Sequence, residues 1–89
     1  MELTLYSRAW CHLCDDLLAE LAPIAVEFGA LIDVIDIDAN PALEAVYNEL
    51  VPLLSFEGAE LSRYHLNVQR VREALQAHID KARAIGRFP

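Results

Sequence analysis

The chain has 89 residues, of which 55% are hydrophobic and 24% are charged, so it has room for one small domain with a packed core and is too apolar for a disordered chain. Its net charge of −7 argues against nucleic-acid binding, which needs a dominant basic surface. Because the chain shows neither a signal peptide nor an apolar run of the ~18 residues that a membrane helix needs, we expect a cytoplasmic protein with no membrane association.

The first part of the chain predicts a strand, a helix and a second strand. Residues 3–6 alternate apolar and polar side chains, which is typical of a strand. From Cys14, apolar residues recur with the spacing of one helix face as far as Phe28, and Gly29 is a suitable C-terminal cap. Residues 31–37 are rich in branched apolar side chains and are expected to form a buried strand.

The second part predicts a short helix, a hairpin and a last helix. Asn40 is a good N-cap before Pro41, so a helix is expected through about Asn48. Residues 52–56 and 60–64 form antiparallel strands around a tight turn at Glu57-Gly58. Asn67 caps a last helix that ends at Gly86. The core face of this helix is expected to consist of Val68, Val71, Leu75, Ile79 and Ala82.

The predicted order is therefore β-α-β-α-β-β-α in a single domain, residues 1–89. A helix joins the first two strands, which are expected to be parallel, and a tight turn joins the last two, which are expected to be antiparallel. The fold class is α/β, with a four-stranded mixed sheet flanked by helices.

The two cysteines, Cys11 and Cys14, lie where the first strand passes into the first helix. Backbone N–H groups and the positive end of the helix dipole at this place favour a thiolate. We expect Cys11 to be the exposed nucleophile. Cys14 follows one turn later on the apolar face and would resolve a mixed disulfide formed at Cys11.

The charges near this motif act in opposite directions. Residues 1–60 contain 12 acidic side chains and one basic side chain, Arg8, which is expected to stabilise the thiolate or hold a carboxylate of the partner. Asp15 and Asp16 would raise the thiol pKa. We therefore expect a pKa for Cys11 that is lowered but not extreme. His12 is expected to be an exposed loop residue without a catalytic role.

Residues 5–14 (LYSRAWCHLC) resemble the strand and active-site segment of glutaredoxins, and Trp10 before the first cysteine is similar to thioredoxins. Val51-Pro52 resembles the pair that carries a cis-proline in this superfamily. The resemblance to small bacterial glutaredoxin-like proteins implies a thioredoxin fold, disulfide oxidoreductase activity and a role in cell redox homeostasis. It also implies that Val51 offers backbone hydrogen bonds to a bound thiol peptide and that Pro52 packs near Cys11.

Two departures limit what the resemblance implies. His-Leu separates the cysteines, so the reduction potential does not carry over. Residues 62–67 (SRYHLN) replace the Gly-Gly turn and acidic residues that hold glutathione. Glutathione is thus kept only as a candidate co-substrate, and no bound cofactor is expected. The substrate is expected to be a disulfide-containing protein or a small thiol, recycled by a reductase or glutathione, and the protein is expected to be a monomer.

Other functions of the motif stay open. A structural zinc site normally needs four protein ligands, and beside the two cysteines the chain offers only scattered histidines, so no metal site is expected. The alternative of a different class is a non-enzymatic thioredoxin-fold module that senses redox state or binds a metal or protein. Tyr6 and Trp10 are expected to be core and shoulder residues, and Tyr64 and His65 either line the groove beside Pro52 or end a strand in solvent.

Overall fold

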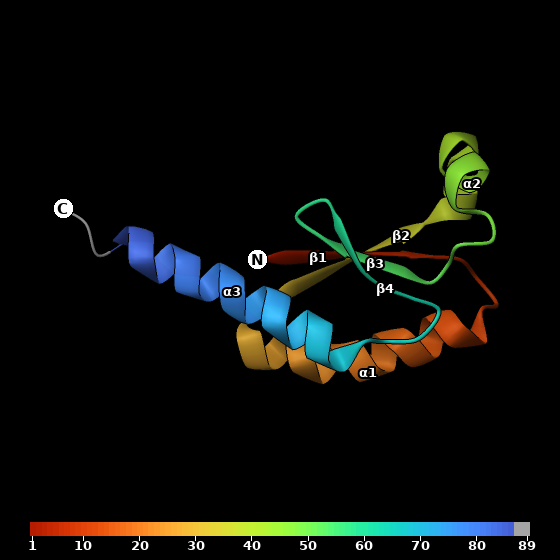
Figure 1. Cartoon of the computed structure of the whole chain (residues 1–89). Helices are drawn as coiled ribbons and strands as arrows, with labels where there is room; N and C mark the ends of the chain where they lie inside the picture. Colours follow the sequence, from red (N-terminus) through yellow and green to blue (C-terminus); the bar gives the residue numbers. More distant parts are fainter. Residues whose placement is uncertain (87–89) are drawn as a thin grey trace.

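The centre of the molecule is a four-stranded sheet with the strand order β2-β1-β3-β4 (Figure 1). The computed structural model describes residues 1–86, with side chains through residue 84. The strands are β1 (Glu2–Ser7), β2 (Leu31–Asp36), β3 (Leu53–Phe56) and β4 (Ala59–Arg63). β1 and β2 are parallel, and β3 is antiparallel to both β1 and β4. The predicted α/β class with a mixed sheet is confirmed.

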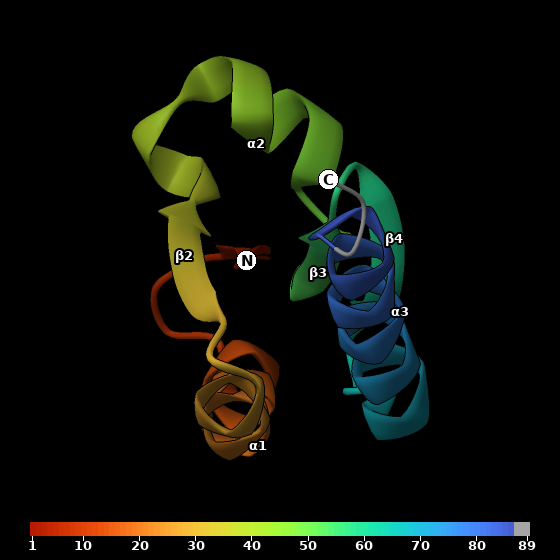
Figure 2. The same cartoon turned by 90° about the vertical axis from the view of Figure 1, so that its left-hand side faces the viewer.

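The helices lie on both sides of this sheet. They are α1 (His12–Phe28), the short 3₁₀ helix η1 (Ile37–Ala39), α2 (Pro41–Tyr47) and α3 (Val68–Gly86). α1 and α3 lie on one side of the sheet, and α2 lies on the other side (Figures 1 and 2). None of these described helices is both long and apolar enough to cross a lipid bilayer.

The core lies between the sheet and the pair α1 and α3. The alternation predicted for β1 places Leu3 and Leu5 inside, and both side chains are completely buried. On the opposite face of β1, Tyr6 stacks on Tyr47 of α2, with ring centroids 4.1 Å apart. The rest of the core comes from β3, β4, α1 and α3, with Leu54, Phe56, Leu61, Leu17, Leu21, Val71 and Leu75 among its members.

The caps inferred from the sequence are present. Asn40 Oδ1 accepts a hydrogen bond from the N–H of Ala42 at 2.9 Å, and Asn67 Oδ1 accepts one from Arg70 at 3.1 Å. Gly29 ends α1 with a φ of 70°, a left-handed conformation that glycine adopts without steric cost. These short polar contacts determine where each helix begins or ends.

Residues 31–36 form the predicted strand, β2, but the prediction that this strand is buried is wrong. β2 is an edge strand with one neighbour, β1, and Leu31 is 69% exposed. A run of branched apolar residues is typical of strands covered on both faces, but the second face of this edge carries no helix that buries it. Ile37, the last residue of the predicted strand, belongs to η1 and is buried.

The core face predicted for the last helix is too long. Val71 and Leu75 are completely buried, but Val68 is 43% exposed and Ala82 is also exposed. Figure 1 shows the reason, because the C-terminal half of α3 extends past the end of the sheet. The helix reaches Gly86, and whether it ends there, as predicted, depends on residues outside the described part of the chain.

Candidate redox site

The two loops that carry the predicted site residues leave the same edge of the sheet. Tyr6, near the end of β1, pairs with Leu53 at the start of β3. The loop after β1 therefore lies beside the loop before β3. The first loop leads to Cys11 and the second contains Val51-Pro52, so the topology brings these two segments to one place.

The cysteines are joined at the start of α1. Cys11 is the N-cap residue, and its Sγ accepts a hydrogen bond from the backbone N–H of Cys14 at 3.2 Å. The two side chains form a disulfide, with Cα atoms 5.2 Å apart. Cys14 is only 2% exposed, whereas Cys11 is half-buried. One sulfur can thus be reached from solvent and the other is shielded beneath it.

The environment of Cys11 is that of a helix N-terminus. The first backbone N–H groups of a helix lack partners within it, and together with the dipole they stabilise negative charge. One of these groups, the N–H of Cys14, already points at Cys11 Sγ. The lowered pKa that the sequence predicts for the Cys11 thiol concerns the reduced protein and stays a prediction.

Trp10 does not lie where it was expected. Its side chain is fully exposed, so it is not a shoulder residue packed against the body of the protein. Its backbone has a φ of 60°, which is uncommon for a residue other than glycine and marks a sharp change of chain direction between β1 and α1. Leu13, on the other side of Cys11, is 39% exposed. Two exposed apolar residues thus lie on either side of Cys11 along the chain.

The second loop is held in place by Tyr64. The Val51-Pro52 peptide bond is cis, as the resemblance implies, and Pro52 is buried. The backbone N–H of Tyr64 donates to the Pro52 carbonyl at 2.7 Å, and the Tyr64 hydroxyl donates to the Glu49 carbonyl, also at 2.7 Å. Tyr64 therefore lies beside Pro52 and fixes both sides of this loop. Its left-handed backbone, with a φ of 67°, directs the chain there.

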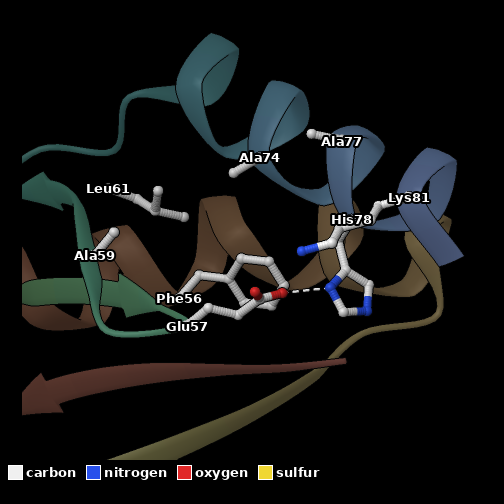
Figure 3. Close-up of a pocket in the computed structure, with 8 residues that line it drawn as sticks. All are labelled: Phe56, Glu57, Ala59, Leu61, Ala74, Ala77, His78 and Lys81. Atoms are coloured by element: carbon white, nitrogen blue, oxygen red, sulfur yellow. Dashed lines mark hydrogen bonds and ion pairs between the residues drawn. The ribbon is translucent and has the colours of Figure 1, made fainter.

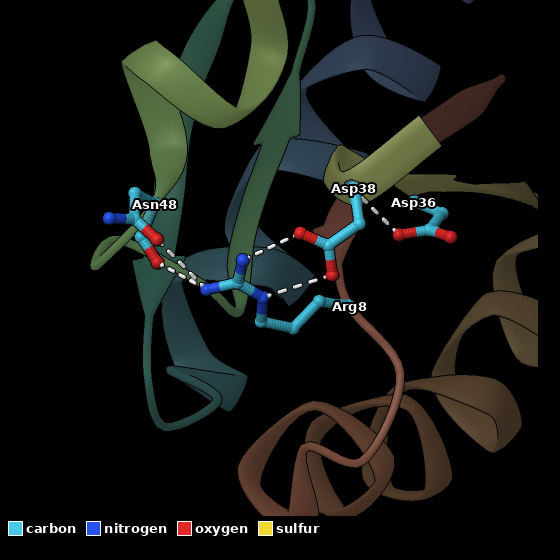
Figure 4. Close-up of polar contacts among 4 residues, drawn as sticks. All are labelled: Arg8, Asp36, Asp38 and Asn48. Atoms are coloured by element: carbon cyan, nitrogen blue, oxygen red, sulfur yellow. Dashed lines mark hydrogen bonds and ion pairs between the residues drawn. The ribbon is translucent and has the colours of Figure 1, made fainter. Parts of the chain in front are cut away.

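Arg8 makes its hydrogen bonds within the protein (Figure 4). Nη2 and Nε donate to the two Asp38 carboxylate oxygens at 2.6 and 3.2 Å. Nη1 donates to the backbone carbonyl and to the Oδ1 of Asn48 at 2.9 and 3.0 Å. The hydrogen bonds from Arg8 lower the pKa of the Asp38 carboxyl. Arg8 thereby joins the cysteine loop to η1 and to the end of α2, and its predicted contact with a substrate or thiolate is untested.

Two hollows lie on the surface of the protein, one of them beside the site. A hollow of about 280 Å³ beside the cysteine loop is lined by Ser7, Arg8, Ala9, Val34 and Asp36. A larger hollow of about 350 Å³ lies between the β3-β4 hairpin and α3 (Figure 3). It is lined in part by Phe56, which pairs with Leu3 near the beginning of β1, so it lies at the opposite end of the sheet from Cys11.

Within residues 1–86, no group of three His, Cys, Asp or Glu side chains is placed to hold a metal ion.

Residues 2–76 match the family described as the glutaredoxin-like domain (DUF836). The chain belongs to this family. Among solved structures, this glutaredoxin-like chain is similar to protein XcR50 from X. campestris, with 38% identity and a TM-score of 0.66 over 84% of this chain and 96% of that one. It is also similar to protein Ne2328 from Nitrosomonas europaea, with 33% identity and a TM-score of 0.71 over 82% and 88%.

The thioredoxin fold is shown by a more distant likeness. Thioredoxin 1 from Thermosipho africanus is 23% identical to this glutaredoxin-like protein, with a TM-score of 0.65 over 93% of this chain and 99% of that one. At this identity the likeness concerns the fold alone. The strand order and the parallel pair β1 and β2 agree with the fold that the resemblance implied.

Sequence reasoning missed the residues that hold the site loops of this glutaredoxin-like protein together. Asp38, Asn48 and Glu49 contact Arg8 or Tyr64 but carry no motif. One signal was present, since a single cation among 12 acidic side chains in residues 1–60 is expected to be paired. The sequence did not say which carboxylate the pairing would use.

Proposed function

We propose that this glutaredoxin-like protein is a thiol–disulfide oxidoreductase in which Cys11 is the nucleophile and Cys14 the resolving residue. The observation that supports this proposal is the pair of bonded sulfurs at the N-terminus of α1, one half-buried and the other 2% exposed. Thiol–disulfide exchange needs an accessible thiolate and a second thiol within bonding distance. The cytoplasmic location expected from the sequence stays a prediction.

The reaction begins with the reduced dithiol. The Cys11 thiolate attacks one sulfur of a substrate disulfide, so a bond forms between Cys11 and that sulfur, the substrate S–S bond breaks, and the first substrate thiolate leaves. The Cys14 thiolate then attacks Cys11 Sγ, which closes the Cys11–Cys14 disulfide and releases the second substrate thiolate. Two electrons pass from the dithiol to the substrate, and its two protons leave with the released thiols.

The protein returns to the dithiol through a thiol reductant that supplies two electrons. Glutathione and the dithiol of a protein reductase are the two candidates. In this proposal Val51 and Pro52 lie next to the bound disulfide, because their loop leaves the sheet beside the cysteine loop. Tyr64 keeps that loop in position through its bonds to the Pro52 and Glu49 carbonyls.

Serine variants of the two cysteines test these roles. The reduced protein is mixed with hydroxyethyl disulfide, and the products are alkylated and weighed by mass spectrometry. Cys11→Ser should lower the consumption of disulfide to the uncatalysed rate, because the accessible nucleophile is gone. Cys14→Ser should accumulate a mixed disulfide at Cys11, because nothing resolves it.

The results also separate the enzyme from a sensor. Catalysis with a thiol reductant present should give many turnovers per protein molecule. A protein that is oxidised once and then fails to turn over would be a redox sensor or binding module. Equal turnover in Cys11→Ser and wild type would exclude the proposed roles.

A further inference from the structure

The surroundings of the cysteine pair carry an excess of negative charge. Asp15 lies one helical turn after Cys11, and its N–H donates to the Cys11 carbonyl at 3.1 Å. Its side chain is exposed, and residues four apart lie on the same face of a helix. Asp16 follows it, and Asp36 and Glu49 lie at the ends of the neighbouring elements, also exposed. The segments around Cys11 thus carry several exposed carboxylates.

The cation that could balance these charges is already paired. Arg8 is the only basic side chain among residues 1–60, and it donates to both carboxylate oxygens of Asp38. On β4, Arg63 forms an ion pair with Glu60 at 2.7 Å. The other lysine and arginine side chains in the described part of the chain, from Arg70 to Arg83, lie on α3. No free cation is thus left on the loops of the site to receive an anionic substrate group.

Two features of the cysteine loop fit a cationic group. The hollow of about 280 Å³ lined by Arg8, Ala9 and Asp36 lies directly beside the cysteine loop. Because Asp38 neutralises the charge of Arg8, the net charge of the residues that line this hollow comes from Asp36. Trp10 is fully exposed next to Cys11, and the face of an indole ring attracts cations more strongly than other aromatic rings do.

We propose that the site reacts preferentially with disulfides that carry positive charge close to the sulfur pair, and disfavours anionic disulfides such as oxidised glutathione. This inference depends on the proposed oxidoreductase function and names its substrate class. The cationic group lies in the hollow beside Ala9, with Asp36 and Asp15 as its counter-charges. The electron transfer is the exchange described above, so the charge affects only how well each substrate reaches Cys11.

Three small disulfides of similar length provide the test: cystamine, which is a dication, hydroxyethyl disulfide, which is neutral, and dithiodipropionate, which is a dianion. Reduced protein is mixed with each in a single turnover, and the oxidised protein is measured by alkylation and mass spectrometry. Each rate is divided by the rate of 2-mercaptoethanol with the same disulfide. This division removes the intrinsic reactivity of the three disulfides.

The expected order is cystamine, hydroxyethyl disulfide, dithiodipropionate. Two unit charges about 10 Å apart in water change a rate about twofold. If two carboxylates act on only the nearer charge of each disulfide, the dication and the dianion should differ by roughly tenfold at low salt. At 1 M salt, where the Debye length is about 3 Å, the ratio should fall to about twofold or less.

Single-residue variants identify the carboxylates that produce the preference for cationic disulfides. Asp36→Asn keeps the oxygen that accepts the Asp38 N–H at 2.9 Å, and Asp15→Asn keeps the size of that side chain. Each should lower the ratio of cystamine to dithiodipropionate by about threefold, as expected from removing one nearby charge. Glu20 is exposed and lies five residues after Asp15 on α1, farther from Cys11. Glu20→Gln is therefore the matched control and should leave the ratio unchanged.

The outcomes separate the inference from the function on which it depends. If hydroxyethyl disulfide reacts through Cys11 but the corrected ratio is near one or favours the dianion, the charge preference is wrong and the oxidoreductase stands. The charge preference is also wrong if the ratio of cystamine to dithiodipropionate persists at 1 M salt. The same holds if Glu20→Gln lowers this ratio as much as Asp36→Asn does. If none of the three disulfides reacts faster with the protein than with 2-mercaptoethanol, the proposed function itself fails.

Discussion

Arg8 connects three segments that are remote from one another in the sequence. Its guanidinium group holds the Asp38 carboxylate on η1 and two oxygen atoms of Asn48 at the end of α2. Arginine suits this position because its planar group donates in several fixed directions at once. The cysteine loop and the start of the loop to Pro52 are thereby tied to the same side chain.

Because Arg8 and Asp38 form an ion pair, we expect the stability of the folded protein to depend on pH in the acid range. Arg8 lowers the pKa of Asp38 in the folded protein, so this contribution is present above the unfolded pKa of about 3.9 and is lost as the pH falls through the lower folded pKa. Asp38→Asn should therefore be less stable than wild type at pH 7, with the two melting temperatures converging below pH 4. Thermal unfolding followed by circular dichroism measures this.

The control for that experiment is Glu20→Gln. Glu20 is exposed and has no ion-pair partner in the described part of the chain, so this variant should follow the wild-type acid profile. A constant difference between Asp38→Asn and wild type from pH 7 to pH 2.5 would show that the loss has another cause.

Among single residues, the cysteine pair could be predicted from the sequence, but the residues that hold its loop in place could not. The spacing of Cys11 and Cys14, at the start of a helix face, is a local pattern and could be read directly. The partners of Arg8 are 30 and 40 positions away, and only the packing of η1 and α2 decides which carboxylate and which carbonyl meet it. Side chains that act across elements leave no periodic signal.

α2 is the element that depends most on its ends. It has seven residues and no buried residue, whereas most helical stability in proteins comes from a packed apolar face. Its contacts are the Asn40 cap, the stacking of Tyr47 on Tyr6, and the hydrogen bonds from Arg8 to Asn48. We therefore expect α2 to be the first helix to open.

Removing the cap of α2 tests this expectation. Asn40→Ala should cost about 0.5–2 kcal/mol, and most of this loss should appear as local opening. In hydrogen exchange, amides of residues 43–48 should exchange faster while those of α1 stay protected. Asn67→Ala removes the equivalent cap of α3, whose Val71 and Leu75 are buried, so it should leave the middle of α3 protected. Equal acceleration of α1 and α2 in Asn40→Ala would instead indicate global unfolding.

The elements themselves could be predicted from local signals, and their burial could not. Asn40-Pro41 and Glu57-Gly58 marked a helix start and a turn correctly. The composition of residues 31–37 predicts a buried strand, because composition does not distinguish a central strand from an edge strand. That difference depends on the strand order, which places β2 outside β1.

The molecule as a whole is elongated, because α3 is longer than the sheet that it covers. The extents are 47 × 25 × 16 Å, and a 19-residue helix such as α3 is itself about 28 Å long. The match to the glutaredoxin-like family ends at residue 76, one residue after Leu75, the last buried residue of α3 among those through residue 84. Burial decreases along the next turns, because His78 and Ile79 are half-buried and residues 80–84 are exposed.

Two alanine variants on α3 should locate the limit of the core. Leu75→Ala removes a completely buried side chain and should cost about 2–5 kcal/mol, which lowers the melting temperature by about 10 °C or more in a domain of this size. Ile79→Ala, one turn later and half-buried, should cost about 1 kcal/mol or less. Denaturation by urea measures both, and similar losses in the two variants would show that the core continues along α3.

The exposed side chain of Trp10 gives the protein its own optical reporter. It is the single tryptophan of the chain and directly precedes Cys11, and no packing shields its indole ring from water. Because disulfides and thiolates quench indole emission, the intrinsic fluorescence of the unlabelled protein should differ between its oxidised and reduced forms. The emission maximum should shift to shorter wavelength when a bound substrate or partner covers the ring. Both the redox change and the binding can therefore be followed in real time without a dye.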